Sequence, residues 1–385
     1  MYTRLRNCRV LEPGGNDWSL VDIGIRDGIV AAVGEVPTSV EDKTKDLHGY
    51  NVSPSWIDLH THVYKWGTSL GVDADAMGRR SGVGVFVDAG SAGAGNFAGF
   101  REFVIRRSEA KIYSFLNIGF GGIPFFGLHN AVQASEISKI EVADMDACEE
   151  CIRKNRDLIL GIKVRLSAAA NGELGAAPLK MAKRVAKKLG IPVMLHFGKP
   201  PPDVGKLIGL LDRGDILTHS LRPEPNSIMA RDGSGHVLKR VREAQKRGVL
   251  IDVGHGSGSF SFHVAEAALR DGFIPDSIST DIHTLSVPEP VRDLPTTMTK
   301  MLNLGMGLED IVNAVTFWPA QAIRKPRHGS IKAGNLADMV AFETANASMN
   351  LTDSTGAKRR VTKAIRPVIR VKGDSLTRIP WRPFR

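Results

Sequence analysis

The chain has 385 residues, of which 42% are hydrophobic and 24% are charged, a composition that excludes a largely disordered protein. No stretch approaches the roughly 18 consecutive apolar residues of a membrane-spanning helix, and residues 1–13 lack a secretory signal, so neither a membrane partner nor secretion is expected. The formal net charge is +10, and the last 35 residues supply +8 of it through ten Lys or Arg against two Asp or Glu.

The first 50 residues predict short strands joined by turns. Val21, Ile23 and Ile25 alternate with other residues at a period of two, as half-buried strands do. From Val52 onward the pattern changes to short, continuous apolar runs, which indicates parallel strands buried on both faces. The runs cover residues 53–62, 82–90, 111–119, 158–167, 191–198, 214–220, 248–256 and 277–283.

Amphipathic helices are expected between these runs. In the segment 177–190, five apolar residues share one face and Gly190 ends the helix: Leu179, Ala182, Val185, Ala186 and Leu189. Eight strand–helix units predict an α/β fold with a (β/α)8 TIM barrel over residues 54–328. Strand-like patterns return afterwards, so residues 329–385 and 1–53 are expected to form a small β-sandwich domain from both chain ends.

The basic C-terminal segment contains the sequence VTKAIRPVIRVKG, in which charged residues alternate with β-branched ones. Aromatic residues are not interleaved with the charges. This pattern predicts the solvated face of a strand rather than a nucleic-acid site, so no nucleic-acid partner is expected.

Potential metal ligands lie where the predicted strands end, which is where the active site of such a barrel forms. Side chains two apart on a strand point to the same face, so His60 and His62 can reach one metal ion. Other runs carry or end near Lys163, His196, His219, His255 and Asp281. Five histidines at the ends of eight strands are far more than a random distribution of the 11 in the chain would give.

Lys163 is an unusual member of this set. It lies between Ile162 and Val164, so its amine is expected in a crowded and partly desolvated site. Burial lowers the pKa of a lysine, and a neutral amine can take up CO₂ to form a carbamate with two oxygens. The alternative is a lysine paired with a nearby carboxylate.

These residues carry a family resemblance. The hexapeptide Ile57-Asp58-Leu59-His60-Thr61-His62, the ligand set and the segment 334–340 (GNLADMV) resemble the amidohydrolase superfamily. More narrowly, VDAGSAGAGNFAGF, GIKVRLS, DILTHS, DVGHGSGSF and Asp281-Ile282-His283 resemble its amidohydrolase/deacetylase branch, which is related to dihydroorotases. The resemblance covers essentially the whole chain.

The resemblance implies two divalent metal ions, with zinc expected. His60, His62 and Asp281 would hold the more buried ion, His196 and His219 the other, and an N6-carboxylated Lys163 would bridge both. A hydroxide between the metals would attack the substrate carbonyl, with Asp281 as the catalytic residue that accepts and returns the proton.

Three further residues are expected to bind the substrate. His255 lies in a glycine-rich loop at the rim, Ser91 ends the second run, and Arg165 follows Lys163 by two positions and can bind an anion or pair with a barrel carboxylate. The remaining histidines that we considered lack a companion at a useful spacing and are expected to be structural or at the surface: His129, His236, His263 and His283.

The substrate is expected to be a small molecule. Dihydroorotase-like sequences carry an arginine just after the H-x-H pair, whereas this chain has Val63, Tyr64 and Lys65. Hydrolysis of an ester or amide by a deacylase or deacetylase is therefore favoured over a cyclic amidohydrolase. A non-catalytic scaffold is disfavoured because all six ligands are present.

The cysteines bear on the cellular compartment. Cys8, Cys148 and Cys151 do not form a disulfide framework, which suits a reducing cytoplasm. Cys148 and Cys151 form a CxxC pair within a charged helical pattern and have no second pair, so they are expected to be structural. A homo-oligomer is compatible with the sequence.

Overall fold

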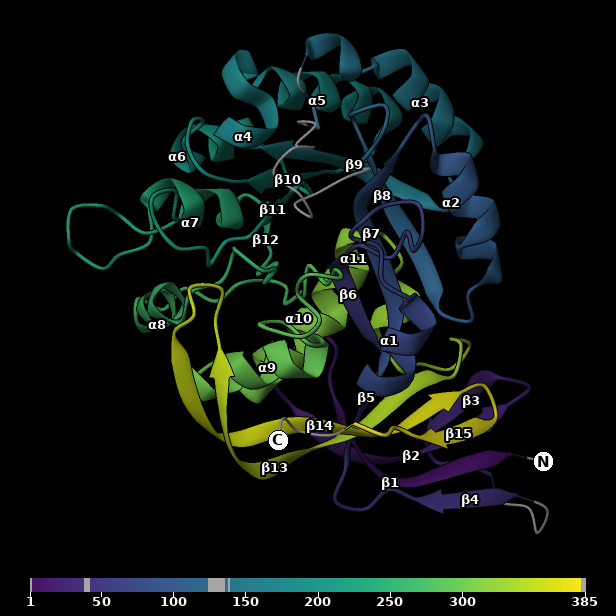
Figure 1. The fold of residues 1–385 in the computed structure, drawn as a ribbon. Coiled ribbons are helices and arrows are strands. Elements are labelled where there is room, and N and C mark those ends of the chain that lie inside the picture. Colours follow the sequence, from purple (N-terminus) through teal and green to yellow (C-terminus); the bar gives the residue numbers. More distant parts are fainter. Residues whose placement is uncertain (1, 38–41, 124–135, 138, 382–385) are drawn as a thin grey trace.

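The computed structural model describes residues 2–37, 42–123, 136–137 and 139–381, and His129 lies outside them. The described chain contains a parallel sheet covered by helices and a second, mainly antiparallel sheet below it (Figure 1). No described helix combines the length and the apolar character that crossing a bilayer requires.

Seven of the predicted runs form the parallel sheet, in the order β12-β11-β10-β9-β8-β7-β6. The strands are β6 (Trp56–Thr61), β7 (Val83–Gly93), β8 (Lys111–Asn117), β9 (Ile159–Leu166), β10 (Val193–Phe197), β11 (Ile216–Thr218) and β12 (Leu250–Ile251). Consecutive strands are neighbours and run in the same direction, so their C-terminal ends meet at one edge.

The eighth predicted run, residues 277–283, differs from the expectation because it is not a continuous strand. It makes isolated parallel bridges beside both edge strands, between Asp252 and Ser277 and between Thr61 and Ile282. The backbone N–H of Asp281 donates to the carbonyl of His60 at 2.7 Å. The run therefore brings Asp281 to the C-terminal end of β6.

The helices follow the strands as the sequence predicts. They are α1 (Ala74–Ser81), α2 (Phe97–Phe103), α3 (Met145–Lys154), α4 (Ala168–Asn171), α5 (Ala177–Leu189), α6 (Val204–Leu207), α7 (Lys239–Lys246), α8 (Phe262–Arg270), α9 (Leu294–Asn303), α10 (Leu308–Val315) and α11 (Phe317–Ala322). Helix α5 buries the apolar face predicted for it and ends at Gly190, which has a left-handed φ of 67°. Helices α2, α3 and α5 pack against β7, β8, β9 and β10, so these strands are buried as expected (Figure 1).

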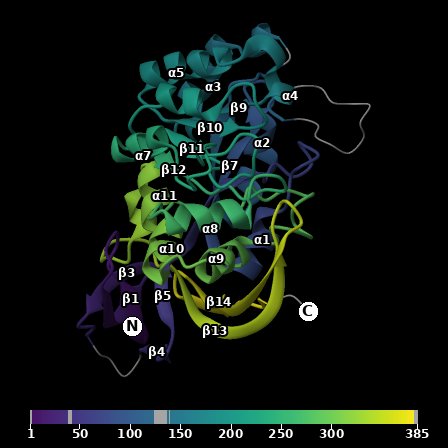
Figure 2. The ribbon, with the colours of Figure 1, turned by 90° about the vertical axis from the view of Figure 1, so that its left-hand side faces the viewer.

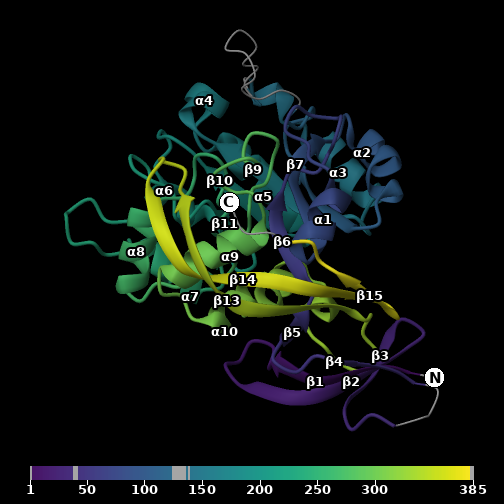
Figure 3. The ribbon, with the colours of Figure 1, turned by 60° about the horizontal axis from the view of Figure 1, so that its bottom comes forward.

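The two ends of the chain meet in the second sheet, of order β15-β14-β13-β5-β1-β2-β3 with β4 beside β1 (Figure 3). Its strands are β1 (Thr3–Leu11), β2 (Trp18–Arg26), β3 (Ile29–Gly34), β4 (Lys43–Asp46), β5 (Asn51–Pro54), β13 (Asp338–Thr352), β14 (Lys358–Lys372) and β15 (Ser375–Arg378). Because β5 pairs with both β1 and β13, hydrogen bonds join all these strands, from both ends of the chain, into one continuous sheet. The basic C-terminal segment lies largely in β14 of this sheet.

The β13–β14 hairpin is the longest element of the second sheet, with 15 residues in each strand. It curves away from the other strands and rises beside α9 and α8 toward the parallel sheet (Figures 1 and 2). Its turn therefore reaches the loops at the C-terminal edge of that sheet.

Candidate metal centre

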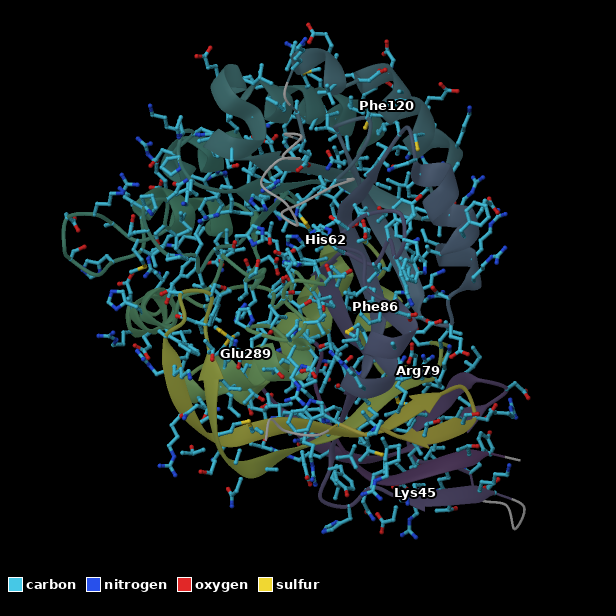
Figure 4. The ribbon with its side chains drawn as sticks, in the orientation of Figure 1. Lys45, His62, Arg79, Phe86, Phe120 and Glu289 are labelled. Atoms are coloured by element: carbon cyan, nitrogen blue, oxygen red, sulfur yellow. The ribbon has the colours of Figure 1, made fainter. Side chains whose placement is uncertain are left out.

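All six predicted ligands lie at the C-terminal edge of the parallel sheet. His60 is in β6 with His62 just beyond it, Lys163 is in β9, His196 is in β10, His219 directly follows β11, and Asp281 lies in the segment 277–283. His62 is at the centre of the molecule in Figure 4, surrounded by side chains from the parallel strands. The fold thus gathers residues that are far apart in the sequence.

His60, His62 and Asp281 form a group that could hold a metal ion, since their ligand atoms all lie within 4.8 Å of one another. Oδ1 of Asp281 is 3.3 Å from Nε2 of His60 and 3.1 Å from Nε2 of His62. The amine of Lys163 lies 3.0 Å from Nε2 of His60, and both side chains are almost completely buried.

His196 and His219 form the second part of the centre. Nδ1 of His196 lies 2.6 Å from Nε2 of His219. The ring of His219 is also 4.9 Å from that of His60, measured between centroids, so the two parts adjoin.

Hydrogen bonds behind the imidazoles fix which nitrogen faces the centre. The backbone carbonyl of Gly254 lies 2.6 Å from Nδ1 of His219, and because a carbonyl can only accept, Nδ1 carries the proton. The hydroxyl of Ser91 lies 2.8 Å from Nδ1 of His62. These contacts leave the Nε2 lone pairs directed inward, as metal ligands require.

Burial sets the protonation of the centre. It lowers the pKa of His60 and of His196 well below the usual value and that of His219 to about 3, so these imidazoles are neutral at physiological pH. At 2.6 Å, the facing nitrogens of His196 and His219 either share one proton in a neutral hydrogen bond or direct both lone pairs at a cation. The donor set of nitrogens and a carboxylate suits zinc or a similar divalent ion.

Burial also lowers the pKa of Lys163 to about 8, which makes its neutral amine accessible near neutral pH. Space for this side chain comes from Gly90, where an added Cβ would lie only 2.7 Å from Cγ of Lys163. The amine has no carboxylate within ion-pair distance among the described residues, which disfavours the alternative of a simple Lys–carboxylate pair.

Two of the ligand positions have strained backbones. His219 has φ of 70° and Asp281 has φ of 48°, in the left-handed region that non-glycine residues rarely adopt. Such conformations persist where the surrounding structure imposes them, and they concentrate at functional sites.

Five of the six predicted ligands line a cavity of about 390 Å³, and His219 lies behind them. The wall of the cavity also contains three basic residues, Arg165, Lys199 and Arg222, and the hydroxyls of Ser257 and Ser259. Arg165 lies 3.3 Å from a carboxylate oxygen of Glu136, so it both lines the cavity and makes the carboxylate contact considered from the sequence.

Two of the residues expected to bind the substrate do not line the cavity. His255 is fully buried, with Nε2 2.8 Å from the amine of Lys300 and Nδ1 2.9 Å from the carbonyl of Gly256, so both nitrogens are engaged within the protein. Ser91 is also fully buried and contacts the outer nitrogen of His62 rather than lining the cavity. Neither residue lines the cavity: Ser91 lies within β7 and His255 lies in the loop after β12.

Sequence reasoning missed His283, which we expected to be structural or at the surface. Its side chain is buried and lines the cavity, with its ring centroid 6.3 Å from that of His62. The signal was present, because His283 follows Asp281 by two positions just as His62 follows His60. His236 and His263 are exposed, as expected.

Arg222 was also missed, although it follows His219 by only three positions. It is 8% exposed, and its Nη1 donates to the carbonyl of Phe197 while its Nε has no hydrogen-bond partner. Among the described residues no carboxylate pairs with it, and burial followed by the nearby charge of Arg165 lowers its pKa to about 10. A buried arginine without a counter-ion is costly unless a ligand supplies one.

Comparison with known proteins agrees with this geometry. The amidohydrolase family model matches residues 51–365. A deacetylase of Agrobacterium fabrum is 38% identical over 90% of this chain and 84% of its own. A solved structure described as a dihydroorotase is 36% identical with a TM-score of 0.88, over 98% of this chain and 97% of its own. Another solved structure, described as an adenine deaminase, is 31% identical with a TM-score of 0.88, and the match covers 98% of this chain and 99% of its own. The chain therefore belongs to the amidohydrolase family and is a hydrolase of amide or ester bonds.

Proposed function

We propose that this hydrolase is a metal-dependent deacylase that removes an acyl group, such as acetyl, from the amide or ester of a small molecule. The observation that carries the proposal is the convergence of six ligand side chains, five of which line one cavity. Hydrogen bonds hold the outer nitrogens of His60, His62 and His219. The relative from Agrobacterium fabrum, which is named a deacetylase, supports the choice of reaction.

The ligand roles are part of this proposal. His60, His62 and Asp281 would hold one ion, His196 and His219 would hold the other, and Lys163, carboxylated on its amine, would supply further oxygen ligands. Zinc is the ion we favour. Bound divalent ions would polarise the scissile carbonyl and lower the pKa of water at the site.

Asp281 is proposed to move the proton. Its carboxylate takes a proton from the attacking water as the oxygen bonds to the acyl carbon, and delivers it to the leaving nitrogen or oxygen as the old bond breaks. The position fits this role, since one carboxylate oxygen contacts His60 and His62 while the other lies beside Gly256.

The leaving part of the substrate is proposed to carry a negative charge. Arg222 is buried, meets no counter-ion in the described part of the chain, and lines the same cavity as Arg165 and Lys199. A carboxylate on the substrate would pair with this basic wall. N-acyl amino acids and acyl esters of hydroxy acids have this chemistry.

Cyclic amide hydrolysis is the second candidate, favoured by the likeness to the structure described as a dihydroorotase. Lys65 does not supply the missing arginine of that pattern, because its amine pairs with Asp73 at 2.9 Å and the residue does not line the cavity. The linear substrates therefore remain our first choice.

A substrate screen tests the proposal. Zinc-loaded enzyme is assayed with N-acyl amino acids, acyl esters of hydroxy acids and cyclic amides, beside the variant Asp281→Asn. We expect hydrolysis of a linear, anionic acyl compound by the wild type, and loss of turnover in the variant with most of the metal retained. Turnover confined to cyclic amides would favour the second candidate, and metal well below one equivalent without turnover would point to a scaffold.

The remaining architecture is proposed as follows. Residues 54–328 make a barrel domain in which the run 277–283 takes the place of the eighth strand, and residues 1–53 with 329–385 make the small β-domain. The three cysteines are unpaired, which supports a reducing, cytoplasmic location.

A further inference from the structure

The turn of the β13–β14 hairpin is hydrogen-bonded to the loop between β12 and α8, which borders the cavity. Ser354 donates from its backbone N–H to the carbonyl of Phe260 at 3.0 Å, and its hydroxyl accepts from the N–H of Phe260 at 3.3 Å. The same hydroxyl donates to the carbonyl of Gly256 at 2.9 Å. One serine thus binds two points of the loop between β12 and α8.

Asp353 adds a further hydrogen bond between the hairpin turn and the loop, and it also stabilises the conformation of the turn. Its Oδ2 accepts from the N–H of Phe262 at 2.8 Å, while its Oδ1 accepts from the N–H groups of Thr355 and Ala357 at 2.8 and 3.0 Å. The carboxylate is 2% exposed, so these bonds are shielded from water. These hydrogen bonds therefore fix the position of the loop relative to the turn.

Lys300 of α9 joins the hairpin to the loop from below. Its amine donates to the carbonyl of Thr352 at 2.7 Å, to that of Pro290 at 2.6 Å and to Nε2 of His255 at 2.8 Å. The ring of His255 stacks on Phe260 with centroids 4.3 Å apart. All three protons of the ammonium group have acceptors, which is why a nearly inaccessible lysine is tolerated here.

The loop held in this way forms one wall of the substrate cavity through Ser257, Gly258 and Ser259. Gly256 lies against Asp281, since an added Cβ there would be 2.3 Å from Oδ2 of that carboxylate. A shift of the loop would therefore move both the wall of the cavity and the support of Asp281.

We propose that the β13–β14 turn is a positioning device for the active-site loop 255–260, and that Ser354 is its principal positioning residue. This inference rests on the proposed function of the cavity, but the contacts themselves do not depend on the substrate. Ser354 touches neither the cavity nor a metal ligand, so its effect would pass through the loop.

Ser354→Ala removes both hydroxyl bonds with little change in volume. Ser348→Ala is the matched control, because Ser348 is exposed on β13 of the same hairpin and its hydroxyl accepts a hydrogen bond from Arg360, its one side-chain partner among the described residues. Ser354→Thr keeps the hydroxyl and serves as the rescue variant. Zinc-loaded proteins are compared by hydrogen exchange of peptides covering 255–262 and by steady-state kinetics on the best substrate of the screen.

We expect faster exchange across 255–262 in Ser354→Ala alone, and a fall in kcat/KM of roughly tenfold that Ser354→Thr largely restores. Metal content should match that of the wild type. Unchanged exchange, or a kcat/KM within about twofold of the wild type despite faster exchange, would overturn the inference. If the wild type hydrolyses no acyl compound, the proposed function fails, and the positioning claim is then decided by the exchange of the loop.

Discussion

Nδ1 of His60 lies 2.8 Å from the hydroxyl of Thr218, although the two residues belong to β6 and β11. The hydroxyl donates its own proton to Oδ2 of Asp252 at 2.7 Å, so it accepts from Nδ1–H of His60. Asp252 is fully buried and also accepts from Ser279 at 2.7 Å. A buried carboxylate thus fixes the tautomer of a proposed metal ligand through an intervening hydroxyl.

Thr218→Val is expected to weaken metal binding. The substitution keeps the shape of the side chain but leaves Nδ1–H of His60 without its acceptor, and loss of such a partner lowers metal affinity by roughly 10–100-fold. Zinc affinity is measured by competition with a chelator. Thr218→Ser retains the hydroxyl and should bind zinc as the wild type does. Equal affinities in the Val and Ser variants would show that the hydroxyl does not orient His60.

Gly90→Ala is expected to disturb Lys163. Its Cβ would lie 2.7 Å from Cγ of Lys163, and a displacement of about 1 Å in a catalytic group can cost roughly 100-fold in rate. Gly190→Ala is the control, because Gly190 also has a positive φ but has open space around its Cβ position. Both variants should have a lower thermal stability than the wild type, whereas only Gly90→Ala should show a lower kcat/KM and a lower zinc content. Equal activity losses would assign the effect to backbone strain alone.

Arg222→Met is expected to alter selectivity by charge. Removing a charged hydrogen-bond partner should lower kcat/KM for an anionic acyl substrate by roughly 10–100-fold, while an uncharged ester of the same compound should be hydrolysed nearly as before. The free enzyme should keep or gain stability, because the variant removes a buried charge that has no counter-ion. An equal loss for both substrates would refute the pairing of Arg222 with a substrate anion.

Lys300 is expected to make stability depend on pH. Burial lowers its pKa to about 7, with Asp353, Glu289 and Asp293 opposing the shift, while His255 accepts from the amine. The unfolded chain, with a lysine pKa near 10.5, then binds more protons than the folded chain between about pH 7 and 10. The free energy of unfolding should therefore rise with pH over this window by a few kcal/mol from this group.

The contribution of Lys300 is isolated by comparison with Lys300→Met. Urea unfolding of both proteins at equal zinc loading, from pH 6.5 to 9.5, gives the difference in stability at each pH. The free energy of unfolding of the wild type minus that of Lys300→Met should increase steadily as the pH rises. A constant difference would mean that Lys300 titrates alike in the folded and unfolded chains.

Much of the fold and the ligand set could be predicted from the sequence because both depend on local pattern. Continuous apolar runs identified seven parallel strands, and the histidines, lysine and aspartate at their ends were predicted to meet at one edge. The run 277–283 was less regular than expected, because only single bridges join it to Thr61 and Asp252 and Asp281 has a left-handed backbone conformation.

Residues behind the site could not be assigned from the sequence alone. Whether His255 faces the cavity or Lys300 depends on the rotation of a glycine-rich loop, and nothing in its local pattern sets that rotation. Lys300 lies in a helix 45 positions away, and Ser354 lies in a turn of the other sheet. Contacts of this kind arise from packing between elements that are distant in the sequence, so they cannot be predicted from sequence periodicity.

The pairing of β5 with both β1 and β13 has a consequence for biosynthesis. The N-terminal strands leave the ribosome before β13, so one edge of β5 is completed only when β13 emerges. Until then β5 exposes unpaired backbone groups, an edge on which nascent chains can aggregate. Truncation before β13 would leave that edge permanently open, so residues 1–337 expressed without the C-terminal hairpin should accumulate in inclusion bodies.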